Sequence, residues 1–60
     1  MPRFFAKPDA DTVTLTGEQA AHIQKALRMH PGEQLTVCDD GWDYLCSIRT
    51  FESGNVVCDI

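Results

Sequence analysis

Residues 16–28 read TGEQAAHIQKALR. This stretch predicts a capped helix, because Thr16 is a favourable N-cap residue and Gln19 follows at the capping-box spacing. At that spacing each of the two side chains bonds the other residue's backbone N–H. Acidic charge in the first turn and basic charge near the end also suit the helix dipole. Pro31 and Gly32 cannot continue a helix, so we expect one short helix that stops sharply.

The expected helix has two faces of different chemistry. At 100° per residue, one face is apolar and packs against the rest of the chain. This face consists of Ala20, Ile23 and Leu27, with Ala26 at its edge. The opposite face carries Glu18, His22, Lys25 and Arg28. Two interpretations of that outer face stay open: an ordinary solvated surface, or a stripe of cationic and titratable groups that binds a ligand.

The other segments of the chain are typical of strands and turns. Alternation of polar and apolar residues indicates half-buried strands. The strands are expected at residues 2–5, 12–15, 34–38, 42–48 and 56–60. Turn residues separate them, most clearly the hairpin signal Asp39-Asp40-Gly41 and residues 52–55. The order β-β-α-β-β-β with short connections predicts a largely antiparallel α+β domain whose twisted strands curl into a small barrel.

The length allows one domain, residues 1–60, near the lower limit of what folds without disulfides or metals. No stretch is long enough to span a bilayer, and the apolar run of a signal peptide is missing. A cytoplasmic location without a membrane partner is therefore expected. The last strand runs to Ile60 without closing polar residues. We expect a further strand or a partner at this edge, so the chain is interpreted as a piece of a longer protein.

The cysteines do not indicate a metal centre. Their number is odd and all lie in strand-like segments, at Cys38, Cys46 and Cys58. The spacings match no zinc template, and an internal disulfide would leave one thiol over. Packed, reduced thiols are expected. His22 and His30 are eight residues apart, and nothing in the sequence imposes a ligand geometry on them.

Charge is divided unevenly along the chain. Residues 1–32 carry four basic and three acidic side chains, a sum of +1, whereas residues 33–60 carry one basic and six acidic, a sum of −5. A protein that binds nucleic acid on its own is normally basic, because phosphate neutralisation drives its affinity. We therefore expect weak RNA binding at most, confined to the N-terminal segment and the helix.

Four motifs follow one another in a specific order. They are MPRFF at residues 1–5, LTGE at 15–18, HIQKALRM at 22–29 and PGE at 31–33. The Asp40-Gly41 turn, followed by Tyr44 and Ile48, completes the pattern. The set resembles the N-terminal domain of the RsmE family, the 16S ribosomal RNA uridine-N3 methyltransferases, over essentially the whole chain.

The resemblance implies a PUA-like β-barrel that docks RNA. Family members are homodimeric, cytoplasmic enzymes of ribosome biogenesis that methylate a uridine of the small-subunit RNA with S-adenosylmethionine. The cofactor and the active site belong to a C-terminal knotted (SPOUT) methyltransferase domain, which this chain lacks. The sequence departs from the family pattern at Ala21, where a histidine is frequent, and at Ala26, where a valine is common. The first difference removes a polar contact, and the second places a smaller side chain in the core.

The resemblance and the side-chain chemistry together assign an RNA-binding set. Its members are Arg3, His22, Lys25 and Arg28. Lysine and arginine donate to phosphate oxygens, arginine also bidentately. His22 donates when protonated, or stacks on an unpaired base. Arg3 has an alternative interpretation, as a surface arginine that precedes a core strand.

The aromatic residues are mostly expected in the core. Strand alternation places Arg3 and Phe5 on one face and Phe4 on the other, and both phenylalanines are expected to pack rather than stack on bases. Trp42 lies at the expected hairpin tip. It either contacts the missing domain or a second protomer, or folds back onto its own strand.

Catalysis by this chain is not expected. The sequence has no glycine-rich cofactor loop and no spaced nucleophile–base pair, and Asp39-Asp40 is explained by the preference of turns for aspartate. No catalytic, cofactor-binding or metal-binding residue is therefore assigned. Three hypotheses remain: an RNA-docking module of a methyltransferase, an acidic protein-interaction or dimerisation module without nucleic-acid binding, and a folded fragment without separable activity.

Overall fold

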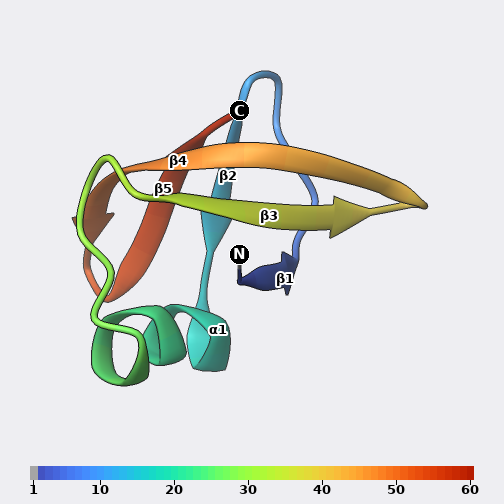
Figure 1. Ribbon diagram of the computed structural model, residues 1–60. Helices are drawn as coiled ribbons and strands as arrows, with labels where there is room; N and C mark the ends of the chain where they lie inside the picture. The colour runs from blue at the N-terminus through green and yellow to red at the C-terminus, as the bar shows by residue number, and fades with distance from the viewer. Residues whose placement is uncertain (1) are drawn as a thin grey trace.

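A computed structural model describes residues 2–60 of the chain (Figure 1). Met1, the first residue of the MPRFF motif, lies outside the described residues. The described residues form five strands and one helical segment in the expected order. Their bounds are β1 (Arg3–Phe5), β2 (Thr12–Leu15), α1 (Gly17–Ala21), η1 (His22–Ala26), β3 (Gln34–Asp39), β4 (Trp42–Glu52) and β5 (Asn55–Asp59). The predicted α+β class and element order are confirmed.

The strands make one sheet in the order β1-β3-β4-β5-β2. Only β1 and β3 pair in parallel; the other neighbouring pairs are antiparallel. The sheet curls into a half-barrel, with α1 and η1 at one end and beside β1 (Figure 1). Arg49 is the extra residue of a bulge at which the β4–β5 register shifts. Such a bulge strengthens the local twist and helps the long strand β4 to bend.

Two tight hairpins connect β3 to β4 and β4 to β5. Asp40 and Gly41 both have positive φ angles, of 47° and 80°, and so do Ser53 and Gly54, at 51° and 82°. Two consecutive positive φ angles are what a two-residue type I′ turn requires. The expected hairpin signal is confirmed, and these turns fix the pairing register of the central strands.

The expectation of an unpaired C-terminal strand is wrong. Strand β5 lies between β4 and β2, and β2 pairs with it along its length, from Thr12 opposite Asp59 to Leu15 opposite Val56. The edges of the sheet are β1 and β2. Sequence alternation identified most of the strands, but it carries no information about which early strand returns to pair with the last one.

The helix is shorter and less regular than expected. α1 has only five residues and continues directly into η1, a π-helical turn in which the Leu27 N–H donates to the His22 carbonyl. The helix ends there, because Arg28 has a left-handed φ of 50°. The wider turn changes the buried positions: Ile23 is fully buried, but Leu27 is 41% exposed and Met29 is buried instead. The expected packing of Leu27 is therefore wrong.

One apolar core lies inside the curled sheet and under the helix. It is formed by Phe4, Val13, Leu15, Ala20, Ile23, Met29, Leu35, Val37, Cys46, Ile48, Val56 and Cys58. Cys46 and Cys58 are buried free thiols, and Cys38 is a partly exposed one. None of the helices in residues 2–60 is long and apolar enough to cross a membrane.

Candidate nucleic-acid interface

The basic residues at the helical segment are all exposed. His22 and Lys25 belong to η1, and Arg28 follows the helix end. The expected stripe assumed one regular α-helix through all three positions. The structure instead places two of them on a π-helical turn and the third on left-handed backbone just after it. Their role in RNA binding stays a prediction, and π-helical turns are frequent at functional sites.

His22 connects the helical segment to β1. Its ring lies against that of Phe4, with the ring centroids 6.4 Å apart and the planes tilted by 60°. Phe4 is buried, at 6% exposure, so the exposed histidine ring adjoins the edge of the core. A tilted aromatic contact of this kind orients the imidazole without covering it.

A second link between the helix and β1 comes from Gln19. The Phe5 N–H donates to its Oε1 at 2.7 Å, and its Nε2 donates to the Phe5 carbonyl at 2.8 Å. The predicted capping box is therefore absent: Thr16 makes no side-chain cap bond, and Gln19 serves the outer edge of β1 instead. Because edge strands expose unpaired backbone groups, the carboxamide acts here as a substitute for one residue of a neighbouring strand.

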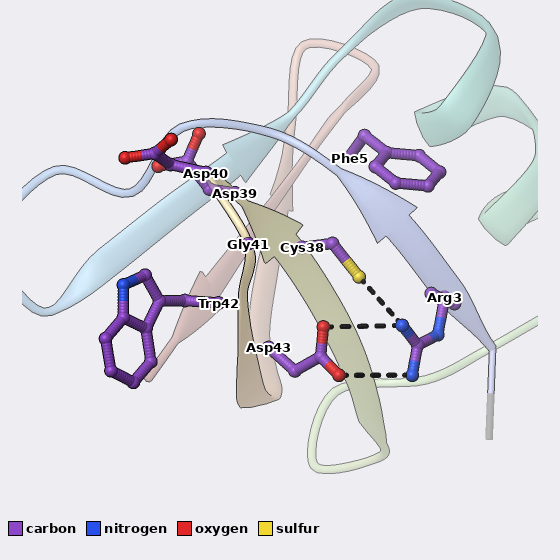
Figure 2. Close-up of a pocket in the computed structure, with 8 residues that line it drawn as sticks. All are labelled: Arg3, Phe5, Cys38, Asp39, Asp40, Gly41, Trp42 and Asp43. Carbon is purple, nitrogen blue, oxygen red and sulfur yellow. Dashed lines mark hydrogen bonds and ion pairs between the residues drawn. The ribbon is translucent and has the colours of Figure 1, made fainter.

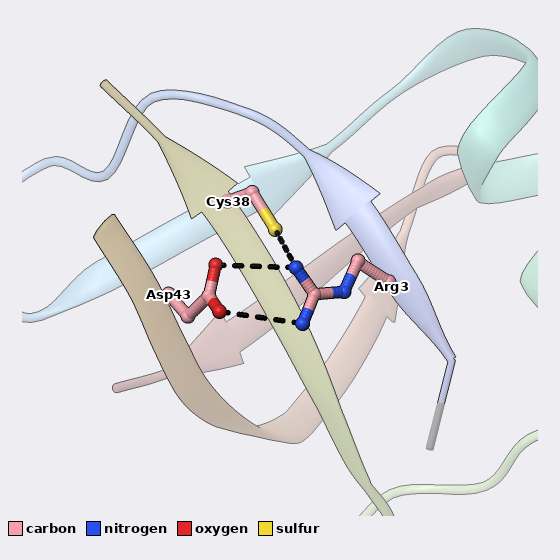
Figure 3. A network of polar contacts seen from close by, with 3 residues as sticks. All are labelled: Arg3, Cys38 and Asp43. Carbon is pink, nitrogen blue, oxygen red and sulfur yellow. Dashed lines mark hydrogen bonds and ion pairs between the residues drawn. The ribbon is translucent and has the colours of Figure 1, made fainter. Parts of the chain in front are cut away.

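The outer face of the sheet carries an ion pair that crosses a strand (Figure 3). Arg3 on β1 meets Asp43 on β4 through two parallel contacts, both 3.3 Å, and its Nη1 also lies 3.3 Å from the Cys38 sulfur on β3. The nearby carboxylate raises the pKa of the Arg3 guanidinium. Burial raises the pKa of the Cys38 thiol, and its hydrogen bond with Asp43 adds to the rise. Cys38 is therefore not an activated nucleophile.

Three large apolar side chains remain exposed near this pair: Phe5 at 70%, Trp42 at 68% and Leu45 at 54%. The expectation that Phe5 packs in the core is wrong, although its predicted alternation with Phe4 is confirmed. Trp42 is exposed at the hairpin tip rather than folded onto its own strand. The sequence contained a signal for Phe5, because a residue that shares a strand face with Arg3 faces solvent whenever Phe4 is buried.

An open hollow of about 290 Å³ adjoins these residues (Figure 2). Arg3, Phe5 and Cys38 line one side of it, and the hairpin tip, residues 39–43, lines the other. Asp43 points toward Arg3, whereas Trp42 points away from the pair. Within residues 2–60, no group of three or more histidine, cysteine or acidic side chains is arranged to hold a metal ion.

Comparison with known proteins identifies the family. A family described as the RNA methyltransferase PUA domain matches residues 15–60 of this chain. The chain belongs to that family. The PUA domain is also 33% identical, over 51 residues, to the ribosomal RNA small subunit methyltransferase E of Bacillus subtilis (strain 168). This alignment covers 83% of the PUA domain and 20% of the relative. The resemblance to the RsmE family is thereby confirmed.

Solved structures agree with this assignment. A crystal structure of a hypothetical protein has a TM-score of 0.82 and 28% identity, and the match covers 95% of the PUA domain and 26% of that chain. A predicted RNA methyltransferase from Thermotoga maritima has a TM-score of 0.81 at 20% identity, over 100% and 28% of the two chains, which shows the shared fold. The PUA domain spans 20–28% of the length of these relatives.

Proposed function

We propose that this PUA domain docks RNA for an S-adenosylmethionine-dependent methyltransferase that methylates N3 of a uridine in 16S ribosomal RNA. Family membership carries the proposal, and the exposed basic residues at the helical segment support it. In this role the domain binds and orients the RNA, and a separate knotted domain of the parent enzyme performs the chemistry. The parent is proposed to be a cytoplasmic homodimer that acts in ribosome biogenesis.

The residues present do not fit S-adenosylmethionine. The hollow is open, and three of its lining side chains are carboxylates, Asp39, Asp40 and Asp43. Cofactor pockets are concave and enclose most of their ligand, whereas an open surface buries little of a ligand of this size. We therefore assign the cofactor to the knotted domain and no catalytic step to this chain.

RNA docking through cationic side chains predicts that the affinity depends on salt concentration. Lys25 and Arg28 are expected to neutralise one phosphate each, with His22 as a hydrogen-bond donor or stacking partner between them and β1. The expected affinity is low, because the whole chain has a net charge of −4. The logarithm of the binding constant then falls linearly with the logarithm of the salt concentration. The slope of this line, the salt slope, is proportional to the number of phosphates contacted.

The test is a titration of a fluorescein-labelled hairpin from the small-subunit RNA at 50 and 200 mM salt. We expect Lys25→Ala/Arg28→Ala to weaken binding about tenfold and to reduce the salt slope by about two. The matched control is Arg49→Ala, since Arg49 is an exposed arginine on β4 that pairs with Asp59. Wild-type affinity in the double variant, or no RNA binding at the lower salt, overturns the proposal.

A second function is favoured by a specific observation, the exposed Trp42 and Leu45 together with the acidic second half of the chain. In this alternative the domain is an acidic protein-interaction or dimerisation module. Sedimentation of the chain over a range of concentrations checks it. Self-association that Trp42→Ala abolishes, without any RNA binding, favours the alternative.

A further inference from the structure

We propose that an unpaired RNA base stacks on the exposed ring of Phe5, with the neighbouring phosphate bound by Arg3. This inference rests on the proposed RNA-docking function and adds a second contact surface to it. The surface is the outer face of β1, which is distinct from the basic residues of the helical segment.

The first argument is that an exposed aromatic ring stands on a fixed backbone. Phe5 is 70% exposed, and its own neighbour Phe4 already provides the core contact of β1. The Phe5 backbone is fixed on both sides, by its position opposite Cys38 in the sheet and by its two hydrogen bonds with the Gln19 carboxamide. A ring on a fixed backbone loses little conformational entropy when a base stacks on it. Base stacking on exposed aromatic residues is the usual way in which proteins bind single-stranded RNA.

The second argument is the position and the free donors of Arg3. It precedes Phe5 by two residues, so both side chains lie on the outer face of β1 (Figure 2). The contacts described within residues 2–60 use three of the five guanidinium N–H groups, two toward Asp43 and one toward Cys38. Two N–H groups remain for a phosphate oxygen, so Asp43 occupies only part of the guanidinium.

The third argument is the distribution of charged side chains around Phe5, which limits the direction in which a bound RNA strand continues. Asp39 and Asp40 lie at the hairpin tip on the far side of the hollow, and their carboxylates repel phosphates (Figure 2). On the other side of β1, Gln19 bonds Phe5 and His22 contacts Phe4, so the helical segment adjoins this strand. A strand of RNA bound at Phe5 therefore continues toward His22 and the basic residues that follow it.

The experiment compares a labelled single-stranded RNA octamer with the same sequence annealed into a duplex. For the 60-residue chain, we expect Phe5→Ala to weaken binding of the single strand about tenfold or more, and Phe5→Tyr to retain it. Duplex binding changes little, because paired bases are unavailable for stacking. Trp42→Ala and Leu45→Ala are the matched controls: both remove an exposed apolar side chain of β4, and Trp42 lines the hollow.

A spectroscopic readout separates stacking from a general loss of structure. Trp42 is the single tryptophan of the chain, so Phe5→Trp combined with Trp42→Phe places the only indole at the proposed site. Single-stranded RNA is expected to quench its emission, whereas the emission of Trp42 in the wild-type chain stays unchanged. The opposite pattern, with quenching at Trp42 only, overturns the inference.

Failure of this inference is distinguishable from failure of the proposed function. If Phe5→Ala binds RNA like the wild type while Lys25→Ala/Arg28→Ala loses binding, the stacking site is wrong and RNA docking stands. If an arginine-rich peptide binds at the hollow and RNA binds nowhere, both are wrong and the face is a protein contact.

Discussion

The carboxamide of Gln19 pairs with both backbone polar groups of Phe5, 14 residues earlier in the chain. The pairing reproduces the two hydrogen bonds that a neighbouring strand would make with an edge residue. It also fixes the start of the helical segment beside β1, because Gln19 lies in the first turn of α1. One polar side chain therefore closes part of the sheet edge and attaches the helix to it.

Replacing Gln19 by alanine removes both hydrogen bonds. We expect a loss of about 1–2 kcal/mol in the free energy of unfolding, since each bond contributes about 0.5–1.5 kcal/mol and water replaces it partly at this exposed site. Urea unfolding followed by circular dichroism measures the change. Gln34→Ala, at an exposed glutamine in β3, is the control and is expected to change little.

Replacing Gln19 by glutamate tests separately the hydrogen bond that its Nε2 donates to Phe5. Gln19→Glu keeps an acceptor for the Phe5 N–H, but its ionised carboxylate cannot donate to the Phe5 carbonyl. Only the protonated carboxyl restores that bond, so the deficit relative to the wild type is expected to shrink as the pH falls from 7 to about 4. A deficit that stays constant over this range contradicts the two-bond arrangement.

Most of the fold follows from local signals in the sequence. Alternation identified the strands, and Asp40-Gly41 identified a hairpin, because only a few residue types accept two positive φ angles in succession. The pairing of β5 with β2 was missed, since it joins segments more than 40 residues apart and depends on the curvature of the whole sheet. Gln19 was assigned to a cap because its other partner, Phe5, is close only in the folded chain.

The π-helical turn shifts the packed positions at the helix end. With a regular α-helix, Leu27 would face the core, but the structure buries Met29 and leaves Leu27 41% exposed. We expect Met29→Ala to lower the free energy of unfolding by about 2 kcal/mol or more, and Leu27→Ala to lower it by less than about 1 kcal/mol. Thermal or urea unfolding of the two variants checks this. The reverse ranking would favour a regular helix.

The same turn explains why the candidate site was only partly predictable. Spacing of three placed His22, Lys25 and Arg28 in one α-helical stripe, and exposure of all three is confirmed. The left-handed backbone at Arg28 was not predictable, because arginine has no preference for that conformation. The pairing of Arg3 with Asp43 was not predictable either, since Asp43 lies on β4, which is not next to β1 in the sheet.

In the proposed RNA complex, Asp43 and a phosphate would share the guanidinium of Arg3. Replacing Asp43 by asparagine keeps the size of the side chain but removes the charge that faces the guanidinium. We expect Asp43→Asn to tighten RNA binding by about two- to fivefold and to steepen the salt slope by about one phosphate, because Arg3 then acts as an unpaired cation. Stability is expected to change little, since exposed ion pairs contribute little to folding.

The control for this change is Asp59→Asn, which breaks the exposed pair of Asp59 with Arg49 on another part of the sheet. It removes the same charge, so a general effect of net charge raises RNA affinity equally in both variants. A larger gain for Asp43→Asn, which Arg3→Ala cancels, identifies Arg3 as the responsible group. Equal gains would remove Arg3 from the RNA-binding set.

The tip of the β3–β4 hairpin is held by backbone conformation. Gly41 has a φ of 80°, and a Cβ added there would meet no neighbouring atom within 4 Å. Gly41→Ala is therefore expected to cost about 1–2 kcal/mol through backbone strain alone, without any clash. Asp40→Asn, which keeps a residue that accepts left-handed backbone, is the control. Equal unfolding free energies for wild type and Gly41→Ala would contradict this account.

The Cys58 thiol is expected to make the free energy of unfolding depend on pH in the alkaline range. Burial raises the pKa of this thiol from 9.0 to about 11, and the neighbouring Cys46 and Asp59 add to the rise. The unfolded chain loses this proton near pH 9, whereas the folded chain keeps it until about pH 11. The stabilising contribution is therefore complete below pH 9 and is lost as the pH rises to 11, a difference of about 2 kcal/mol.

Removing the thiol isolates this effect from other groups that titrate at high pH. Cys58→Ala is expected to be less stable than the wild type at pH 7, because it leaves a void in the core. Between pH 9 and 11, however, its stability falls less steeply, so the two curves converge by about 2 kcal/mol. Urea unfolding under reducing conditions at pH 7, 9, 10 and 11 measures both curves. Parallel curves would mean that the Cys58 thiol ionises in the folded chain as easily as in the unfolded one.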